Sequence, residues 1–301
     1  MAVGSLDVSC AACGARLVIA TTHRTARCPY CDSPSVVDRP ATEDRPDPIF
    51  AIGFAVDRGR AGAALRAYLQ RRRWAPGALR RATADKVEGV YLPGYLYSAV
   101  ASSEFSAQIG ETYTELQFDP KKKRMRRVTK IEFLPLSGHH RCYVGDRFVT
   151  ASESVANTEL QAIEPFDLGG LRRYGPALVS GWIAEEPSLG REACLELARA
   201  EARAEVHDRL VAFMPGDSHH SLHSAVDLTD EALDLVLLPV WVCSVRWRSD
   251  RPPVRLLVNG QTGAIGGEVP VSWAKIAAAV GAGLALVGLG TLVGALLGWF
   301  G

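Results

Sequence analysis

The sequence is poor in cysteine and in net charge, and both shortages exclude functions. Seven cysteines in 301 residues are too few for a disulfide scaffold. The 34 Lys and Arg nearly cancel the 33 Asp and Glu, so the net charge of +1 excludes nucleic-acid binding by bulk charge and leaves only local patches. Hydrophobic residues make up 48% of the chain and charged residues 22%, which favours a folded core over disorder. At roughly 150 residues per domain, the length suggests about two folded units.

Leader and catalytic motifs are missing too. The longest apolar stretch near the N-terminus, 17–20, is too short for a secretory signal, so we expect the N-terminal part to stay in the cytoplasm. The chain has no G-x4-G-K-[ST] phosphate loop, no H-E-x-x-H zinc motif and no G-x-S-x-G nucleophile elbow. These absences predict that the protein is not an enzyme.

The cysteines that are present cluster near the N-terminus in two C-x2-C pairs. Fourteen residues separate the pairs, which consist of Cys10, Cys13, Cys28 and Cys31. Two such pairs on facing hairpins typically complete a tetrahedral zinc site, and four cysteine ligands leave no open position for substrate. The spacing therefore predicts a zinc ribbon with one structural Zn²⁺. The alternative is a redox site, because residues 28–31 read C-P-Y-C, but the polar segment before them is unlike the core strand that such sites follow.

The remaining chain divides by composition. We expect a zinc ribbon over 1–38, a Pro-rich linker over 39–48, an α+β domain over 49–270 and a membrane anchor over 271–301. Apolar periodicity predicts helices at 61–73 and 190–214. Gathered β-branched and aromatic residues predict strands of a mainly antiparallel sheet at 87–100, 128–136, 147–151, 236–247 and 254–258.

The C-terminal segment lacks charge altogether. Residues 276–300 contain only Thr291 as a polar side chain and reach ~37 Å as a helix, which predicts a single transmembrane helix. Basic residues precede this segment and none follows it, so we expect the N-terminal domains on the cytoplasmic side. Gly290, Gly294 and Gly298 recur every four residues, a spacing typical of self-association or packing against a partner helix in the bilayer.

A dense basic run follows Asp119-Pro120. It comprises Lys121, Lys122, Lys123, Arg124, Arg126 and Arg127. The simplest interpretation is that this run forms the solvated tip of a hairpin and has no binding role. Two alternatives are contact with anionic lipid headgroups and, less favoured because no aromatic residue interrupts the run, contact with nucleic acid.

Other candidate ligand residues look structural. Asp217, His219, His220 and His223 crowd one segment, but the neighbouring Pro215-Gly216 favours an exposed loop over a second metal site. His139-His140, after Ser137-Gly138, reads as a turn, and the isolated Cys142, Cys194 and Cys243 as packing residues.

Several motifs carry a family resemblance. They are GVYLPGY at 89–95, LPVWV at 238–242, VNGQTG at 258–263 and GEVPVSWAKI at 267–276. With the cysteine pairs, they resemble a bacterial family of zinc-ribbon membrane proteins whose members are often labelled primosomal protein N′ or superfamily II helicase-like. The usual Trp of the first motif is replaced here by Tyr95. The resemblance implies a zinc ribbon and a bacterial inner-membrane location, but no established activity, and a helicase would need the phosphate loop that this chain lacks.

These observations favour a membrane-anchored, non-enzymatic adaptor that presents binding surfaces to a protein partner. The alternative is a replication-related nucleic-acid-binding protein that uses the cysteine-rich region and the basic run.

Overall fold

The computed structural model describes residues 5–9, 16–20, 24–27, 34–36, 46–120 and 123–296. The chain forms two compact units, and each unit is assembled from separate segments. Unit 1 comprises Met1–Ala51, Leu92–Asn157 and Arg172–Leu237. Unit 2 comprises Ile52–Tyr91, Thr158–Leu171 and Leu238–Gly301.

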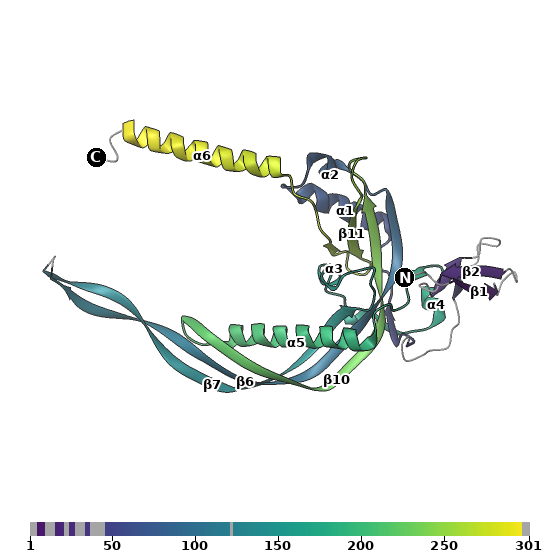
Figure 1. Cartoon of the computed structure of the whole chain (residues 1–301), viewed down its shortest axis with the longest axis horizontal. Helices are drawn as coiled ribbons and strands as arrows, with labels where there is room; N and C mark the ends of the chain where they lie inside the picture. Colours follow the sequence, from purple (N-terminus) through teal and green to yellow (C-terminus); the bar gives the residue numbers. More distant parts are fainter. Residues whose placement is uncertain are drawn as a thin grey trace. The chain divides into compact units, whose positions relative to one another are not determined.

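Most of the described chain is β-structure (Figure 1). Two antiparallel pairs come first, β1 with β2 and β3 with β4, and β5 to β12 form one eight-stranded sheet. The order runs β12-β11-β10-β5-β8, and β6 pairs with β10, β7 and β9. The strands are β1 Ser5–Ser9, β2 Arg16–Ala20, β3 Thr25–Arg27, β4 Pro34–Val36, β5 Phe50–Ile52, β6 Lys86–Asp119, β7 Arg124–Thr150, β8 Leu171–Arg173, β9 Ile183–Ala184, β10 Ser218–Val245, β11 Val254–Asn259 and β12 Ile265–Gly266.

Among the described helices, α1, α5 and α6 are long and the others have five residues or fewer. They are α1 Arg58–Arg71, α2 Gly77–Arg81, α3 Asn157–Gln161, the 3-10 helix η1 Leu168–Gly170, α4 Pro176–Val179, α5 Arg191–Phe213 and α6 Trp273–Leu296. Helix α1 begins at the cap residue Asp57, whose carboxylate accepts the backbone N–H of Arg60 at 2.9 Å. That bond satisfies one of the free donors of the first turn.

The core of unit 1 lies between α5 and one face of β6 and β7 (Figure 1). Alternate residues of β6 point inward because strand side chains alternate between faces, while α5 contributes residues spaced by three or four. Small residues on the helix, such as Ala198 and Ala202, let it lie close to the strands. The buried cluster contains Tyr95, Tyr97, Ala99, Ala101, Phe105, Val144, Val149, Cys194, Ala198, Ala202, Val206, Leu210 and Leu235.

The core of unit 2 centres on β11 and the C-terminal part of β10, which pair antiparallel from Val240↔Asn259 to Val245↔Val254. Trp241 is buried, and its indole N–H donates to the carbonyl of Val56 at 2.8 Å. The fully buried Asn259 donates its amide to the carbonyl of Ile163 at 2.9 Å and accepts from the backbone of Gln261 at 2.8 Å. Because a buried amide without partners would be costly, these bonds fix the loops around the strand.

The secondary structure confirms both predicted helices as α1 and α5, while it lengthens the predicted strands. The expected strands at 128–136 and 147–151 are parts of a single strand, β7. The loop predicted at 217–223 is wrong, because β10 begins at Ser218, and the turn predicted at His139-His140 is wrong, because both residues lie inside β7. Pairing with neighbouring strands overrides the local turn preference.

The predicted fold class needs correction. Instead of a zinc ribbon, an α+β domain and a membrane helix, the described residues form a mixed α and β structure dominated by one large sheet. They contain no group of three or more His, Cys, Asp or Glu side chains that could hold a metal ion. Cys10, Cys13, Cys28 and Cys31 lie outside the described residues, so metal binding by these four side chains stays a prediction.

The membrane anchor predicted at 271–301 is also corrected. A bilayer span requires about 20 consecutive apolar residues in a helix. Within the described part of the chain, no helix has the length and apolar character to cross a bilayer. This finding overturns the expected single-pass location in the bacterial inner membrane.

Candidate interaction surface

The longest feature of unit 1 is the β6–β7 hairpin, which is paired from Gly94↔Thr150 to Asp119↔Arg124. One irregularity interrupts the register, between Tyr97 and Ala99, where β7 has an extra residue and Asp146 takes a φ of 62°. Figure 1 shows that the far end of the hairpin extends beyond α5 and the start of β10. From that point the hairpin is a two-stranded ribbon with both faces uncovered.

The register decides which side chains share a face, because residues directly opposite each other in an antiparallel pair point to the same side. On the face turned toward α5, Ala107 lies opposite Leu136 and Ile109 opposite Leu134. On the other face, Glu104 lies opposite His139. Near the core, therefore, the apolar residues point toward α5 and the polar residues point away from it.

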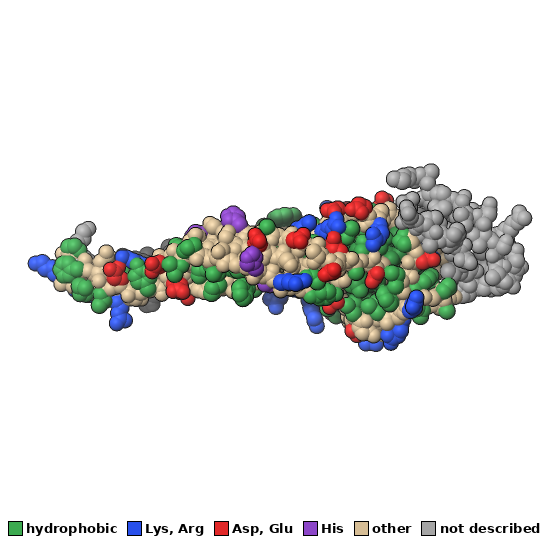
Figure 2. Space-filling view, turned by 90° about the horizontal axis from the view of Figure 1, so that it is seen from below, with side chains coloured by type: hydrophobic (Ala, Val, Ile, Leu, Met, Phe, Trp, Pro, Cys, Tyr) green, Lys and Arg blue, Asp and Glu red, His purple; other side chains and the backbone are tan. Residues whose placement is uncertain are grey.

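Further along the hairpin this polarity reverses. Beyond Gly110 the outward face carries Thr112, Thr114, Thr129 and Arg127 together with apolar residues. Those apolar residues are strongly exposed, with Leu116 60%, Phe118 57% and Met125 56% exposed. We define the apolar hairpin face as Leu116, Phe118, Met125, Ile131 and Phe133. Hydrophobic side chains also gather at this end in Figure 2, beside Lys and Arg.

The opposite face of the same ribbon is charged. Glu111 lies opposite Glu132, Tyr113 opposite Lys130, and Gln117 opposite Arg126. Lys130 forms an ion pair with Glu115. The opposite face also carries Tyr113, which is 44% exposed. Removing apolar side chains from water is favourable, whereas covering charged ones is costly, so the apolar hairpin face gains more from being covered.

The basic run predicted from the sequence surrounds the end of this hairpin. Lys123, Arg124, Arg126 and Arg127 are exposed there, while Lys121 and Lys122 lie outside the described residues. Arg127 lies opposite Leu116 and so shares the apolar hairpin face, whereas Arg126 is on the charged face. The predicted hairpin tip is therefore present, with positive charge on both faces at its end.

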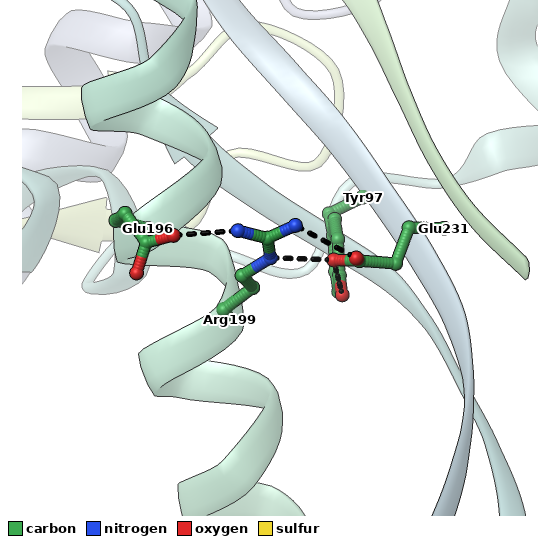
Figure 3. A network of polar contacts seen from close by, with 4 residues as sticks. All are labelled: Tyr97, Glu196, Arg199 and Glu231. Carbon is green, nitrogen blue, oxygen red and sulfur yellow. Dashed lines mark hydrogen bonds and ion pairs between the residues drawn. The ribbon is translucent and has the colours of Figure 1, made fainter. Parts of the chain in front are cut away.

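A polar network ties the hairpin to α5 (Figure 3). The guanidinium group of Arg199 in α5 donates two hydrogen bonds to the carboxylate of Glu231 in β10, at 2.8 and 2.9 Å. It also donates to the carboxylate of Glu196 at 2.6 Å. The buried Tyr97 of β6 donates its hydroxyl to the same Glu231 carboxylate at 2.7 Å. Arg199 and then Tyr97 lower the pKa of Glu231, while burial and the nearby carboxylate raise the pKa of Tyr97.

A second set of bonds holds the point where the hairpin leaves the three-stranded part of the sheet. The carboxylate of Asp217 accepts a hydrogen bond from the backbone N–H of Thr112 at 2.9 Å. The backbone N–H of Asp217 donates to the carbonyl of Gly110 at 3.1 Å. The backbone bond from Thr112 lowers the pKa of Asp217. Gly216 has a φ of +83°, and a Cβ there would stand 3.0 Å from the Gly110 carbonyl. This turn therefore requires glycine.

His139 and His140 of β7 do not form a catalytic triad with the serine and the glutamate opposite them. Ser103 lies 3.5 Å from Nδ1 of His140, and Glu104 lies 3.7 Å from Nδ1 of His139. Successive residues point to opposite faces of the sheet, so these two pairs are separated by the sheet and cannot form a triad. A hollow of about 560 Å³ lies here, and it is lined by Ser102, Ser103, Glu104, His139, His140, Arg141, Ala225, Val226 and Asp227.

The remaining candidate residues from the sequence lie in β10, in buried positions or in α6. His219, His220 and His223 are spread along β10 and form no ligand cluster with neighbouring described residues. Burial raises the pKa of the Cys194 and Cys243 thiols to about 11, which agrees with the packing role expected for them. Gly290 and Gly294 lie in α6, and Gly298 lies outside the described residues.

The sequence predicted the basic run but missed the apolar hairpin face. The sequence does contain apolar residues at 116 and 118, two positions apart as in a strand with one apolar face. They fall on even positions, whereas the apolar residues just before Gly110 fall on odd positions, so the two sets do not form one alternating pattern.

Comparison with known proteins shows a partial similarity. The chain is 26% identical over 137 residues to the uncharacterized protein YdjG of Bacillus subtilis (strain 168). The match covers 43% of this chain and 38% of that protein, so the chain matches well under half of its relative's length. No family model matches the sequence, and no solved structure matches it.

Proposed function

We propose that this protein is a non-enzymatic interaction module that holds a protein partner on the apolar hairpin face. The observation that carries the proposal is the reversal of polarity along the β6–β7 hairpin, which leaves five large, exposed apolar side chains on one face. Of these, Phe133 also lies against the ring of His220, with the ring centroids 4.4 Å apart. Large apolar side chains that are exposed together on one face often mark a binding site.

The chemistry of the surface defines the partner. An apolar strip on the partner would remove Leu116, Phe118 and Met125 from water, at about 25 cal/mol per Å² of apolar area. Acidic groups flanking that strip would meet Arg124, Arg126 and Arg127, and such complementarity speeds association and sets orientation. We therefore infer a partner with an amphipathic segment whose apolar residues are bordered by Asp or Glu.

The scaffold supports this role. A two-stranded ribbon is only marginally stable alone, so its position depends on the sheet and helix at its base. The bonds from Arg199 to Glu231 and from Thr112 to Asp217 hold that base. A fixed ribbon presents its face without a large ordering cost on binding.

The test uses adjacent residues on opposite faces. A photo-crosslinking phenylalanine analogue in place of Phe118 captures the partner in cells, and mass spectrometry locates the cross-linked segment. We expect Leu116→Glu in the full chain to weaken binding of the purified partner at least tenfold, and Gln117→Glu to leave it within twofold. Equal effects of the two variants, or a cross-linked segment without apolar residues, would refute the proposal.

Nucleic-acid binding is the competing outcome of the same experiment. Phosphate contacts would make affinity for single-stranded DNA fall steeply between ~50 and ~200 mM salt. Salt-sensitive DNA binding that is lost in Arg126→Ala and kept in Leu116→Glu would replace the protein-docking proposal.

A further inference from the structure

Unit 2 carries a concentration of positive charge that the docking function does not use. From Arg58 to Arg81 the chain contains eight arginines and no acidic residue. These arginines are Arg58, Arg60, Arg66, Arg71, Arg72, Arg73, Arg80 and Arg81. The segment forms α1, α2 and their connection, so the charge is held on a compact helical pair.

Three of these arginines line a groove. Arg71, Arg72 and Arg73, at the end of α1, border a hollow of about 410 Å³ together with Tyr68, Trp74, Ala75, Gly267, Val269 and Val271. Trp74 is 50% exposed and Val271 49% exposed, so the groove combines cationic groups with an aromatic and aliphatic wall. A volume of this size falls in the range of small-molecule sites.

The groove has fixed walls. The ammonium group of Lys275 donates to the carbonyls of Arg73 and Ala75, at 3.2 and 2.6 Å, and the N–H of Ser272 donates to the carbonyl of Trp74 at 2.7 Å. These bonds join the loop after α1 to the start of α6. They also place the positive charge of Lys275 at the carbonyl end of α1, where the helix dipole is negative.

Of the groove arginines, Arg72 makes a side-chain contact with Tyr68. The guanidinium of Arg72 lies over the ring of Tyr68, with its carbon 4.4 Å from the ring centroid, and also bonds to the Tyr68 hydroxyl. The ion pairs found among the described residues of unit 2 join Lys86 to Glu88, Arg246 to Asp85, Arg248 to Asp250 and Arg255 to Glu159, and none involves the groove arginines. Within the part of the chain that the structure describes, the positive charge that lines the groove is therefore not held in an ion pair.

We propose that this groove binds a phosphate-bearing ligand. Guanidinium groups bind phosphate oxygens through paired N–H donors, so Arg71 and Arg73 hold the phosphate, while Arg72 is positioned by Tyr68. Trp74, Val269 and Val271 contact the organic part of the ligand. The phosphate group has two sources, a free phosphate ester such as a nucleotide or the headgroup of a phospholipid.

A purely structural role for the arginines makes a different prediction. Basic residues in the last turn of a helix stabilise it through the helix dipole, without any ligand. In that case every exposed arginine of the segment behaves alike, and no phosphate compound binds.

The experiment titrates the full chain with adenosine monophosphate by calorimetry, and separately measures its binding to phosphatidylcholine vesicles with and without phosphatidylglycerol. Arg71→Gln combined with Arg73→Gln removes two phosphate contacts, and Arg58→Gln combined with Arg60→Gln is the charge-matched control at the other end of α1. We expect the groove variant to weaken binding at least tenfold and the control to change it less than threefold. Thermal unfolding of both variants shows whether the fold is kept.

Each outcome decides the proposal. Binding of adenosine monophosphate that depends on the groove arginines supports a free phosphate ester. Groove-dependent binding to phosphatidylglycerol vesicles alone supports a headgroup. Equal losses in the groove and control variants show a diffuse charge effect and overturn the site, as does the absence of binding to both probes at millimolar concentration.

Discussion

At the scale of single residues, Glu231 decides how the hairpin is held, because it accepts bonds from two different elements. Tyr97 lies 134 residues away in sequence and Arg199 lies 32 residues away, so no local pattern could reveal their contact. Sequence periodicity placed both Tyr97 and Arg199 on strand and helix, but not the polar bond between them. Such pairs are found only once the strands are in register.

The first prediction concerns this bond. Tyr97→Phe removes a hydroxyl that donates to a carboxylate in a buried setting, and Arg199 still holds Glu231. We expect a loss of about 1 to 2 kcal/mol in the free energy of unfolding. Urea unfolding of the full chain measures the loss, and Tyr113→Phe, on the exposed end of the hairpin, is the control that should stay within about 0.5 kcal/mol of the parent.

The second prediction concerns pH. The pKa of Glu231 is lowered in the folded state from 4.5, mainly by its bond with Arg199, so the unfolded chain binds more protons in acid. The stability from this pair is present above the unfolded pKa and is lost as the pH falls through the folded pKa. As the pH is lowered from about 6 to 3, the free energy of unfolding should fall less steeply in Glu231→Gln than in the parent. Parallel curves would mean that the ion pair contributes nothing.

At the scale of elements, α5 was the most predictable part and the hairpin was the least. The predicted helix 190–214 agrees with α5 within one residue at each end, because its buried positions repeat every three or four residues. The hairpin was predicted only in pieces. Its apolar residues change from odd positions, such as Ile109, to even ones, such as Leu116, so no single alternating pattern covers β6.

The third prediction tests the close approach of α5 to the strands. Ala202 is fully buried against the sheet, whereas Ala200 is on the exposed side of the same helix. Ala202→Leu should overpack the core and cost about 1 to 3 kcal/mol of stability, while Ala200→Leu should change it by less than about 0.5 kcal/mol. Chemical unfolding distinguishes the two variants. Similar values would show that α5 does not pack as described.

At the scale of the whole molecule, the two units cannot be inferred from composition, because each unit draws on three separate stretches of the chain. A change of composition along the sequence marks a domain boundary only where each domain is formed by one continuous stretch of chain. The long strands β6 and β10 each supply residues to both units, so a boundary drawn along the sequence necessarily cuts a strand. This arrangement explains why local reasoning identified elements better than it identified their assembly.

The last prediction concerns the four N-terminal cysteines. In the sequence, Cys10 and Cys13 fall between the paired strands β1 and β2, and Cys28 and Cys31 fall between the paired strands β3 and β4. Two C-x2-C pairs at this spacing in the sequence are typical of a four-cysteine zinc site. We propose one Zn²⁺ per chain, and elemental analysis of the purified full-length protein measures it.

The control for this experiment is another cysteine of the same chain. Cys13→Ser removes one of four thiolates and should lower bound zinc well below one equivalent, because a structural site needs all four ligands. Cys142 is a free thiol in β7, so Cys142→Ser should keep the full equivalent. A metal-free parent protein with a reversible Cys28–Cys31 disulfide would instead support redox chemistry. In that case the C-P-Y-C sequence, rather than the spacing of the two pairs, would be the informative feature of this region.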